Sequence, residues 1–276
     1  MLPGTRATSP WGRRWPPATS TPAPVGQWEG LLAGQLLSPL RAEEEGSSLR
    51  VWGTLPFLPF ASAAEAVLAA AQGPFAEGLA LLLLPMAGPG VQWRRLRTVS
   101  PVPQFEVVLS GVSSDGRGVL AQGQEALQRW RQFLAVATCA EALGACSQVL
   151  EMSLQYAKER VQFGQPIGSF QAIQNRFADM VIDLDITRFL VYDAAWRLAA
   201  GEEAGQQLAY LGAWAGPALE RICVQGHHIN GAMSVTEEYG LEFYSRLALG
   251  ARLALGEPEA AKEGLLAAIQ ARLLEV

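Results

Sequence analysis

Histidine and cysteine side chains are the first candidates for chemistry in this sequence, because both types can bind metals or act on substrates. Both histidines of the chain, His227 and His228, are adjacent. No acidic or cysteine partners accompany them at ligand spacing. The three cysteines, Cys139, Cys146 and Cys223, are too few for a disulfide scaffold, and their spacing matches no metal motif. We therefore expect no metal, and interpret the first two cysteines as small buried side chains in an apolar helical pattern.

The composition indicates a compact globular protein. Half of the 276 residues are hydrophobic, and the formal net charge is -5. The 19 arginines against 2 lysines suggest coding bias, and the negative charge argues against a nucleic-acid partner. The most hydrophobic run, Leu79–Met86, is far shorter than the ~20 residues of a membrane helix. Residues 1–24 lack the apolar core of a signal peptide, so we expect a cytoplasmic protein without membrane contact.

The first half of the chain contains three zones. Residues 1–24 predict a loose tail or a wrongly assigned start, and residues 25–46 a short helix around Trp28–Leu37. Residues 47–123 predict a β-domain, a small barrel or sandwich, because short apolar runs alternate with turn residues. Ser62–Gln72 suggests a short helix between strands. The expected strands are Leu49–Phe60, Leu79–Pro85, Val91–Thr98 and Phe105–Val112.

Residues 124–276 predict an all-helical, up-and-down bundle, so the fold class is α+β with several domains. Apolar residues recur at three- and four-residue steps through Glu125–Gln162, where Pro166 and its flanking glycines end the helix. Ser169 is a candidate N-cap for a second helix reaching about Ala200. Further helices are expected over residues 203–226, 237–254 and 257–275.

One run inside this bundle is far more specific than its periodicity. Residues Tyr156–Met180 read YAKERVQFGQPIGSFQAIQNRFADM, which closely resembles the signature of the acyl-CoA dehydrogenase family. The similarity extends through the turn at 89–91 and covers about residues 48–256. The family's N-terminal helical domain has no counterpart here except a remnant in residues 25–45. The resemblance implies a flavoprotein oxidoreductase of fatty acid or lipid metabolism that uses FAD.

The resemblance also implies roles for single residues. Arg160 would reach the diphosphate or ribose of an FAD held by a neighbouring subunit. Phe163 would pack on the flavin or adenine portion, and Gln171 would bond to the adenosine half. A guanidinium fork, a flat ring and an amide suit these contacts. The alternatives are an ion pair within the bundle for Arg160 and a place in the core for Phe163.

A second family feature is a Gln-x-x-Gly-Gly-x-Gly-aromatic-Thr loop, whose glycines let the backbone approach the cofactor diphosphate. The best match begins at His228, which replaces the glutamine, and keeps Gly231 and Thr236. Other positions depart from the pattern. Two glycines and the aromatic residue are replaced by Ala232, Ser234 and Val235.

The family's catalytic glutamate has no counterpart at either of its two known positions. These positions map to Leu255 and near Leu134, so the catalytic residue of this chain is unknown. The nearest carboxylates are Glu141, Glu125 and Glu257, and a structural role is expected for the first. The family's substrate-gripping Thr-Glu-Pro…Gly-Ser-Asp segment survives at most as residues 43–48, and its flavin-shielding Trp-Ile-Thr strand as residues 57–59.

Three functions follow. The chain can be the base-lacking subunit of a heteromeric acyl-CoA dehydrogenase whose catalytic subunit holds most of the FAD. It can be an independent homomeric enzyme with an atypical base, acting on an acyl-CoA. It can also be a structural relative that binds no flavin. By family analogy, we expect a dimer-of-dimers with a catalytic partner or with itself.

Overall fold

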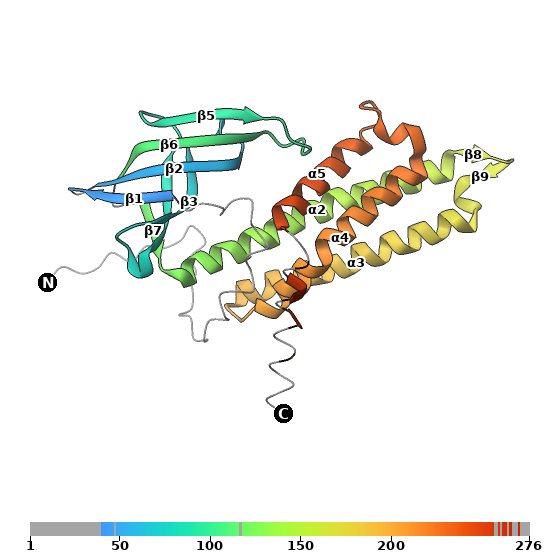
Figure 1. Ribbon diagram of the computed structural model, residues 1–276. Coiled ribbons are helices and arrows are strands. Elements are labelled where there is room, and N and C mark those ends of the chain that lie inside the picture. Colours follow the sequence, from blue (N-terminus) through green and yellow to red (C-terminus); the bar gives the residue numbers. More distant parts are fainter. Residues whose placement is uncertain are drawn as a thin grey trace.

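The computed structural model describes residues 40–256, apart from Ser47, Gly116 and Arg117, and beyond these the positions 259, 261–263, 265, 266 and 270. A β-sheet domain lies beside one end of an elongated helical bundle (Figure 1). The predicted tail over residues 1–24, the expected helix around Trp28–Leu37 and most of the helix predicted over 257–275 lie outside the described residues.

The β-domain is one seven-stranded sheet in the order β5-β6-β2-β1-β3-β4-β7. Neighbouring strands are antiparallel except β1 and β3, which are parallel. The four predicted strands are confirmed as β2, β4, β5 and β6, with small shifts at their ends. The strands are β1 (Leu40–Glu45), β2 (Ser48–Pro59), β3 (Ala66–Gln72), β4 (Leu79–Pro85), β5 (Val91–Leu96), β6 (Gln104–Asp115) and β7 (Val119–Gln122).

Two segments differ from the expectation of helix. Residues Ala66–Gln72 form strand β3, so the short helix predicted over Ser62–Gln72 is wrong there. The segment is rich in alanine, which favours helix, but all seven residues pair with β4, and this pairing overrides the local propensity. Likewise, Leu40–Glu45 form strand β1 at the end of the segment predicted as a helical remnant. The β-domain therefore extends back to at least Leu40 instead of 47.

Four long helices form the bundle, as predicted. They are α2 (Gln124–Glu159), α3 (Gln171–Ala200), α4 (Gly205–Asn230) and α5 (Leu241–Leu255). The prediction of Ser169 as N-cap of α3 is wrong by one residue. Phe170 occupies that position, and the Ser169 hydroxyl donates to the carbonyl of Pro166 at 2.7 Å. The Ser169 hydroxyl is therefore bonded within the 3-10 turn Ile167–Ser169 (η4), which precedes α3, and does not cap the helix.

Helix α2 is the central element of the bundle and packs against α3, α4 and α5. Its buried residues include Val136, Leu143 and Val149. Within the described part of the chain, only α2 is long and apolar enough to cross a membrane, a test that the core helix of a soluble bundle also passes. Cys139 and Cys146 of α2 are buried as predicted, and burial raises the pKa of the Cys139 thiol to about 12.

The sheet and the bundle contact each other at two places. Leu127 and Trp130 of α2 pack with Leu81 of β4, and the Glu77 carboxylate accepts from the backbone N–H of Gln124 at 2.9 Å. This carboxylate caps the start of α2, where the helix dipole favours negative charge. At the second place, described below, α5 returns to the sheet (Figure 1).

Candidate functional site

A short hairpin projects from the end of the bundle that lies away from the sheet (Figure 1). It pairs β8 (Val161–Gln162) with β9 (Gln165–Pro166). Its two loop residues, Phe163 and Gly164, have φ angles of 52° and 82°, as a type I′ turn requires. A bulky side chain rarely adopts this conformation, and the Phe163 side chain is 93% exposed. The hairpin therefore presents an aromatic ring to solvent at a strained position.

Arg160, Phe163 and Gln171 come together around this hairpin, which we call the distal site. Arg160 is the C-cap of α2, and its carbonyl accepts from the N–H of Ile167 at 2.8 Å. The ring of Phe163 contacts that of Phe170 edge-to-face, with centroids 6.1 Å apart, and Gln171 is the first residue of α3. All three side chains are exposed. Among the described residues, no carboxylate pairs with Arg160.

The predicted loop residues His228, Gly231 and Thr236 follow at the end of α4 and in the 3-10 turn Gly231–Val235 (η5). Gly231 has a φ of 57°, and nothing lies within 4 Å of the position that a Cβ would take there. The Thr236 hydroxyl donates to the carbonyl of Met233 at 3.0 Å, so it serves the turn itself. The ring of His228 contacts the Arg176 guanidinium at 3.1 Å, which joins this loop to α3.

The serine that replaces a family glycine in this loop has a structural partner. Ser234 is buried, and its hydroxyl donates to the carbonyl of Gly231 at 2.7 Å and lies 2.8 Å from Nδ1 of His227. The other ring nitrogen of His227 lies 2.9 Å from the hydroxyl of Ser245. Burial lowers the pKa of His227, against an opposing effect of Glu242. The loop is therefore held by side chains where the family pattern has glycines.

A buried polar network lies near the C-terminal ends of α2 and α4. Asn230 is 1% exposed, and its amide donates to the Ser153 hydroxyl and to the Gly226 carbonyl, each at 2.8 Å. The Tyr239 hydroxyl donates to the Asn230 side-chain oxygen at 2.8 Å and contacts the Met152 carbonyl at 3.2 Å. The network therefore joins α2, α4 and the segment before α5 through buried side chains.

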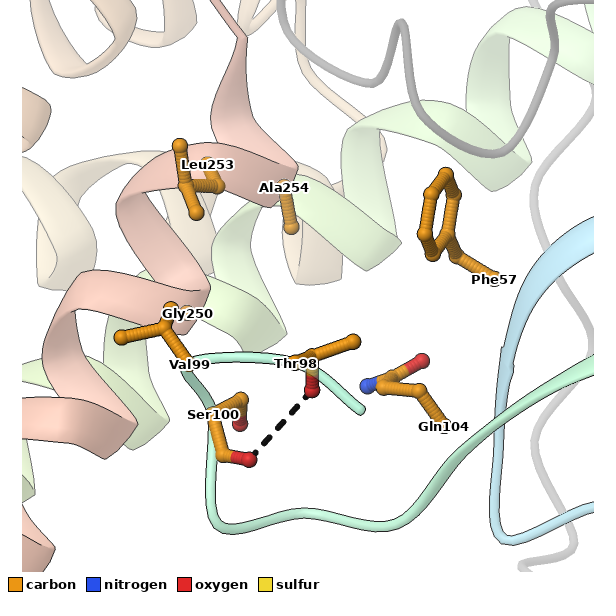
Figure 2. Close-up of a pocket in the computed structure, with 8 residues that line it drawn as sticks. All are labelled: Phe57, Thr98, Val99, Ser100, Gln104, Gly250, Leu253 and Ala254. Carbon is orange, nitrogen blue, oxygen red and sulfur yellow. Dashed lines mark hydrogen bonds between the residues drawn. The ribbon is translucent and has the colours of Figure 1, made fainter. Parts of the chain in front are cut away.

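The second candidate site is a cleft between the sheet and α5, with a cavity of about 250 Å³. Phe57 comes from β2, Gln104 from β6, and Leu253 from α5 (Figure 2). The connection between β5 and β6 closes the lower side (Figure 2). The lining residues are Phe57, Thr98, Val99, Ser100, Gln104, Gly250, Leu253 and Ala254. None of them carries a charge.

The cleft is closed by a close approach of α5 to the β5–β6 connection. A Cβ on Gly250 would lie 2.7 Å from Cβ of Ser100, so only glycine fits without movement. One helical turn earlier, the Arg246 side chain donates through Nε to the carbonyl of Val99 at 2.9 Å and pairs with Glu242 through Nη1. These contacts fix the width of the cleft.

Neither position mapped for the family base places a side chain in this cavity lining. Leu255 is 4% exposed and packs in the core of the bundle, whereas Leu253 and Ala254 of the same helix face the cavity. Leu134 is half-buried on α2. Glu125 and Glu141 are exposed on α2 and do not line the cavity, and Glu257 lies outside the described residues. The segment 43–48 belongs to the β1–β2 hairpin and is absent from the lining.

Sequence reasoning missed two arginines that build these sites. Arg176 joins α3 to Gln225 and His228, and its place inside the signature run was the available signal. The available signal for Arg246 was its four-residue spacing from Glu242, which indicates a helical ion pair. The described residues contain no group of three or more potential metal ligands.

Comparison with known proteins agrees with this architecture. Residues 122–270 match the model of the "Acyl-CoA dehydrogenase, C-terminal domain" family. Acyl-CoA dehydrogenase FadE27 of Mycobacterium tuberculosis is 30% identical over 79% of this chain and 60% of its own length. The probable acyl-CoA dehydrogenase YngJ of Bacillus subtilis is 41% identical over 39% of this chain and 28% of its own length.

Among solved structures, a chain of the ChsE4-ChsE5 complex from Mycobacterium tuberculosis is similar to this one. It has a TM-score of 0.75 and 30% identity over 87% of this chain and 64% of that chain. This chain thus spans less than two thirds of each of these relatives. The matched model covers more than half of the sequence, and the sheet and bundle follow the same fold. The chain therefore belongs to the acyl-CoA dehydrogenase family.

Proposed function

We propose that this chain is the base-lacking subunit of a heteromeric acyl-CoA dehydrogenase, and that its distal site contacts an FAD held largely by the partner subunit. The observation that carries the proposal is the contrast between two sites. The distal site keeps exposed cofactor-type side chains, whereas the cleft of the same chain is lined without any carboxylate.

The distal site fits the adenosine and diphosphate half of FAD. The Arg160 guanidinium is exposed and has no carboxylate partner among the described residues, so it is available to a phosphate. The Phe163 ring offers a flat apolar surface at the tip of the hairpin, and Gln171 offers both a donor and an acceptor. The exposure of all three side chains supports these roles over an internal ion pair for Arg160 and a core position for Phe163.

The cleft does not supply the parts that the reaction needs. Removal of the α-proton of an acyl-CoA requires a base within hydrogen-bond reach, and the uncharged lining offers none. The cavity of about 250 Å³ also lies below the range of roughly 300–1,000 Å³ that is usual for ligand pockets. When bound, FAD supplies the acceptor for the β-hydride. In this proposal the carboxylate that takes the α-proton belongs to the partner subunit.

The comparisons support a partner of the same family. The ChsE4-ChsE5 structure is a complex of two differently named chains, and one of them is similar to 87% of this chain. We extend that arrangement to this chain, with an acyl-CoA as substrate. The partner is expected to contribute both the base and most of the flavin contacts.

The test is the visible spectrum of the protein purified with and without an acyl-CoA dehydrogenase encoded beside its gene. We expect a colourless chain alone and a yellow, active complex. Arg160→Ala should lower the ratio of flavin to protein in the complex because it removes a phosphate partner. Arg95→Ala, which removes an exposed arginine on the sheet, is the matched control and should leave that ratio unchanged.

Two outcomes would contradict the proposal. A chain that is yellow on its own and is bleached by an acyl-CoA would be an independent enzyme with an atypical base. A chain that forms no complex and binds no flavin under any condition would be a structural relative. Flavin retention that is identical in Arg160→Ala and in the wild-type complex would remove the role assigned to this arginine.

A further inference from the structure

The two histidines of this chain are neighbours in sequence, yet their rings lie in different surroundings. His227 is half-buried near the end of α4, and the next residue, His228, is exposed. A neutral imidazole carries its single proton on either Nδ1 or Nε2, and the partners of the two nitrogens decide which one. The hydrogen bonds around each ring therefore show what each histidine can donate and accept.

The partners of His227 place its proton on Nδ1. The Ser234 hydroxyl donates its only proton to the Gly231 carbonyl at 2.7 Å. The hydroxyl oxygen can then only accept from Nδ1 of His227, which lies 2.8 Å away. On the other side of the ring, Nε2 accepts from the Ser245 hydroxyl at 2.9 Å. The ring of His227 thus links the turn η5 to α5 through hydrogen bonds of fixed direction.

The partner of His228 places its proton on the opposite nitrogen. Nδ1 of this ring lies 3.1 Å from Nη1 of Arg176. A guanidinium has donors only, so Nδ1 is the acceptor and the proton lies on Nε2. The same guanidinium nitrogen also donates to the side-chain oxygen of Gln225, which holds Arg176 in place. Among the described residues, Nε2 of His228 has no hydrogen-bond partner, so its N–H is available to a ligand.

The N–H of His228 precedes a turn whose backbone is open to a ligand. Gly231 has a φ of 57°, and nothing lies within 4 Å of the position that a Cβ would take there. The turn η5 itself contains no acidic side chain. A neutral N–H donor beside open backbone suits an anionic oxygen, and the phosphate oxygens of a dinucleotide cofactor are acceptors of that kind.

We infer that His227 and His228 are held as opposite tautomers, so that His227 fixes the turn η5 through Nδ1–H while His228 offers Nε2–H to a phosphate oxygen of the cofactor. Ser234 and Arg176 are the positioning residues for the two rings. The identity of the ligand rests on the proposed function, whereas the two tautomers are properties of the chain alone.

The tautomers can be measured directly, because the chain has only two histidines. Proton–nitrogen correlation spectra of the full chain, labelled with nitrogen-15 in histidine, distinguish a protonated ring nitrogen from one with a lone pair. The spectra are recorded at pH 8, well above the ordinary imidazole pKa of about 6.5. His228→Gln identifies the signals of His227. We expect a protonated Nδ1 in His227 and a protonated Nε2 in His228.

Two single variants should each change one ring. Ser234→Ala removes the acceptor of Nδ1–H, so His227 should become a mixture of tautomers while His228 stays unchanged. Arg176→Met removes the donor to His228 and should have the converse effect. Arg176→Lys keeps a donor and should retain more of the Nε2–H form than Arg176→Met. Glu106→Gln, which removes a charge from an exposed ion pair on the sheet, is the matched control and should alter neither ring.

The consequence for the cofactor is measured in the complex with the partner subunit. The amide nitrogen of His227→Asn lies near the place of Nδ1 and can keep the contact with Ser234, whereas that of His227→Gln lies near the place of Nε2. His227→Gln and Arg176→Met should each raise the FAD dissociation constant by about tenfold, the effect of one lost hydrogen bond. His227→Asn should raise it by less than about threefold.

The inference is overturned if both histidines show the same tautomer, or if Ser234→Ala and Arg176→Met leave the spectra unchanged. If the spectra are as expected but wild type, His227→Gln and Arg176→Met retain FAD equally, the phosphate contact is wrong. A complex that binds no flavin at all contradicts the proposed function instead, and the spectra of the chain alone then decide the tautomers.

Discussion

The distal site and the cleft of this chain differ in what they expose and in how they are held. At the distal site, Arg160, Phe163 and Gln171 point into solvent from a strained hairpin and the helix ends beside it. In the cleft, uncharged side chains face a small cavity between the sheet and α5. Under the proposed function, the distal site serves a partner subunit, while the lining of this chain's own cleft offers no base. The proposal thus separates cofactor contact from proton transfer within one fold.

The contacts near the two sites differ as well. A buried polar network around Asn230 joins α2 and α4 near their C-terminal ends, and each of its hydrogen bonds has a defined partner. Beside the cleft, Gly250 closely approaches Ser100, and Arg246 donates to the Val99 carbonyl. The first set of contacts depends on paired buried polar groups, and the second depends on the absence of a side chain at Gly250. Substitutions can therefore disturb one set without disturbing the other.

The largest effect is expected from removal of the buried amide at the centre of the polar network. Asn230→Ala deletes a buried amide that makes three hydrogen bonds, so the free energy of unfolding should fall by about 2 kcal/mol. Urea denaturation measures the change. Asn175→Ala, an exposed asparagine on α3, is the matched control and should change it by less than about 0.5 kcal/mol. Equal losses in the two variants would show that the buried network does not contribute to the stability of the bundle.

Adding a single methyl group to α5 beside the cleft should lower the stability of the protein. Gly250→Ala places a Cβ 2.7 Å from Cβ of Ser100. The resulting strain exceeds the gain in helix propensity, and we expect a net loss of about 1 kcal/mol in the free energy of unfolding. Ser100→Gly removes the clashing atoms. In the Ser100→Gly background, Gly250→Ala should therefore lower the free energy of unfolding by much less than it does in the wild type. Additive losses in this double-mutant cycle would mean that α5 and the connection do not approach as described.

The strained tip of the hairpin should separate stability from function. Phe163→Asn relieves a left-handed conformation that costs about 1–2 kcal/mol and loses a ring contact worth about 0.5–1.5 kcal/mol, so thermal stability should stay nearly constant. Flavin retention in the complex should nevertheless fall, because the exposed ring is gone. Gly164→Ala, at a φ of 82°, is the converse control: it should lower stability by about 1 kcal/mol and keep the ring. Unchanged flavin retention in Phe163→Asn would remove the ring from the cofactor contact.

The smallest effect concerns pH. Burial lowers the pKa of His227 below its ordinary value of 6.5, so the unfolded chain binds a proton more readily than the folded one. Its neutral ring therefore contributes stability above pH 6.5, and this contribution is lost as the pH falls from there through the lowered pKa. Melting temperatures between pH 7.5 and 5 should fall more for the wild type than for His227→Gln. Parallel curves for the two proteins would assign the pH dependence to other groups.

Sequence patterns were sufficient to predict those helices and strands whose structure follows from the local spacing of apolar residues. Helices α2 to α5 follow from apolar residues at helical spacing, and strands β2 and β4 to β6 follow from short apolar runs between turns. The run Tyr156–Met180 identified the family, which the matched model confirmed. Its residues at the distal site could be named in advance because they lie close together in the chain. The roles given to them remain predictions.

Other features depended on contacts between distant segments. The alanine-rich segment Ala66–Gln72 is a strand because β4 and β1 pair with it, and its own propensity favours helix. The mapping of the base to Leu255 could not show that this side chain enters the core of the bundle while Leu253 and Ala254 face the cleft. That difference is a matter of helix rotation and packing, which alignment does not contain.

The sequence by itself thus determined the family, the helical bundle and the presence of leucine at positions 255 and 134, because these are properties of residue types at fixed spacings. Only the tertiary structure decided that the Arg160 side chain is exposed among the described residues and that Gly250 closely approaches Ser100 beside the cleft. Exposure and close approach arise from the packing of whole elements against one another. For that reason, the surfaces through which this chain would act on a partner became visible only in the fold.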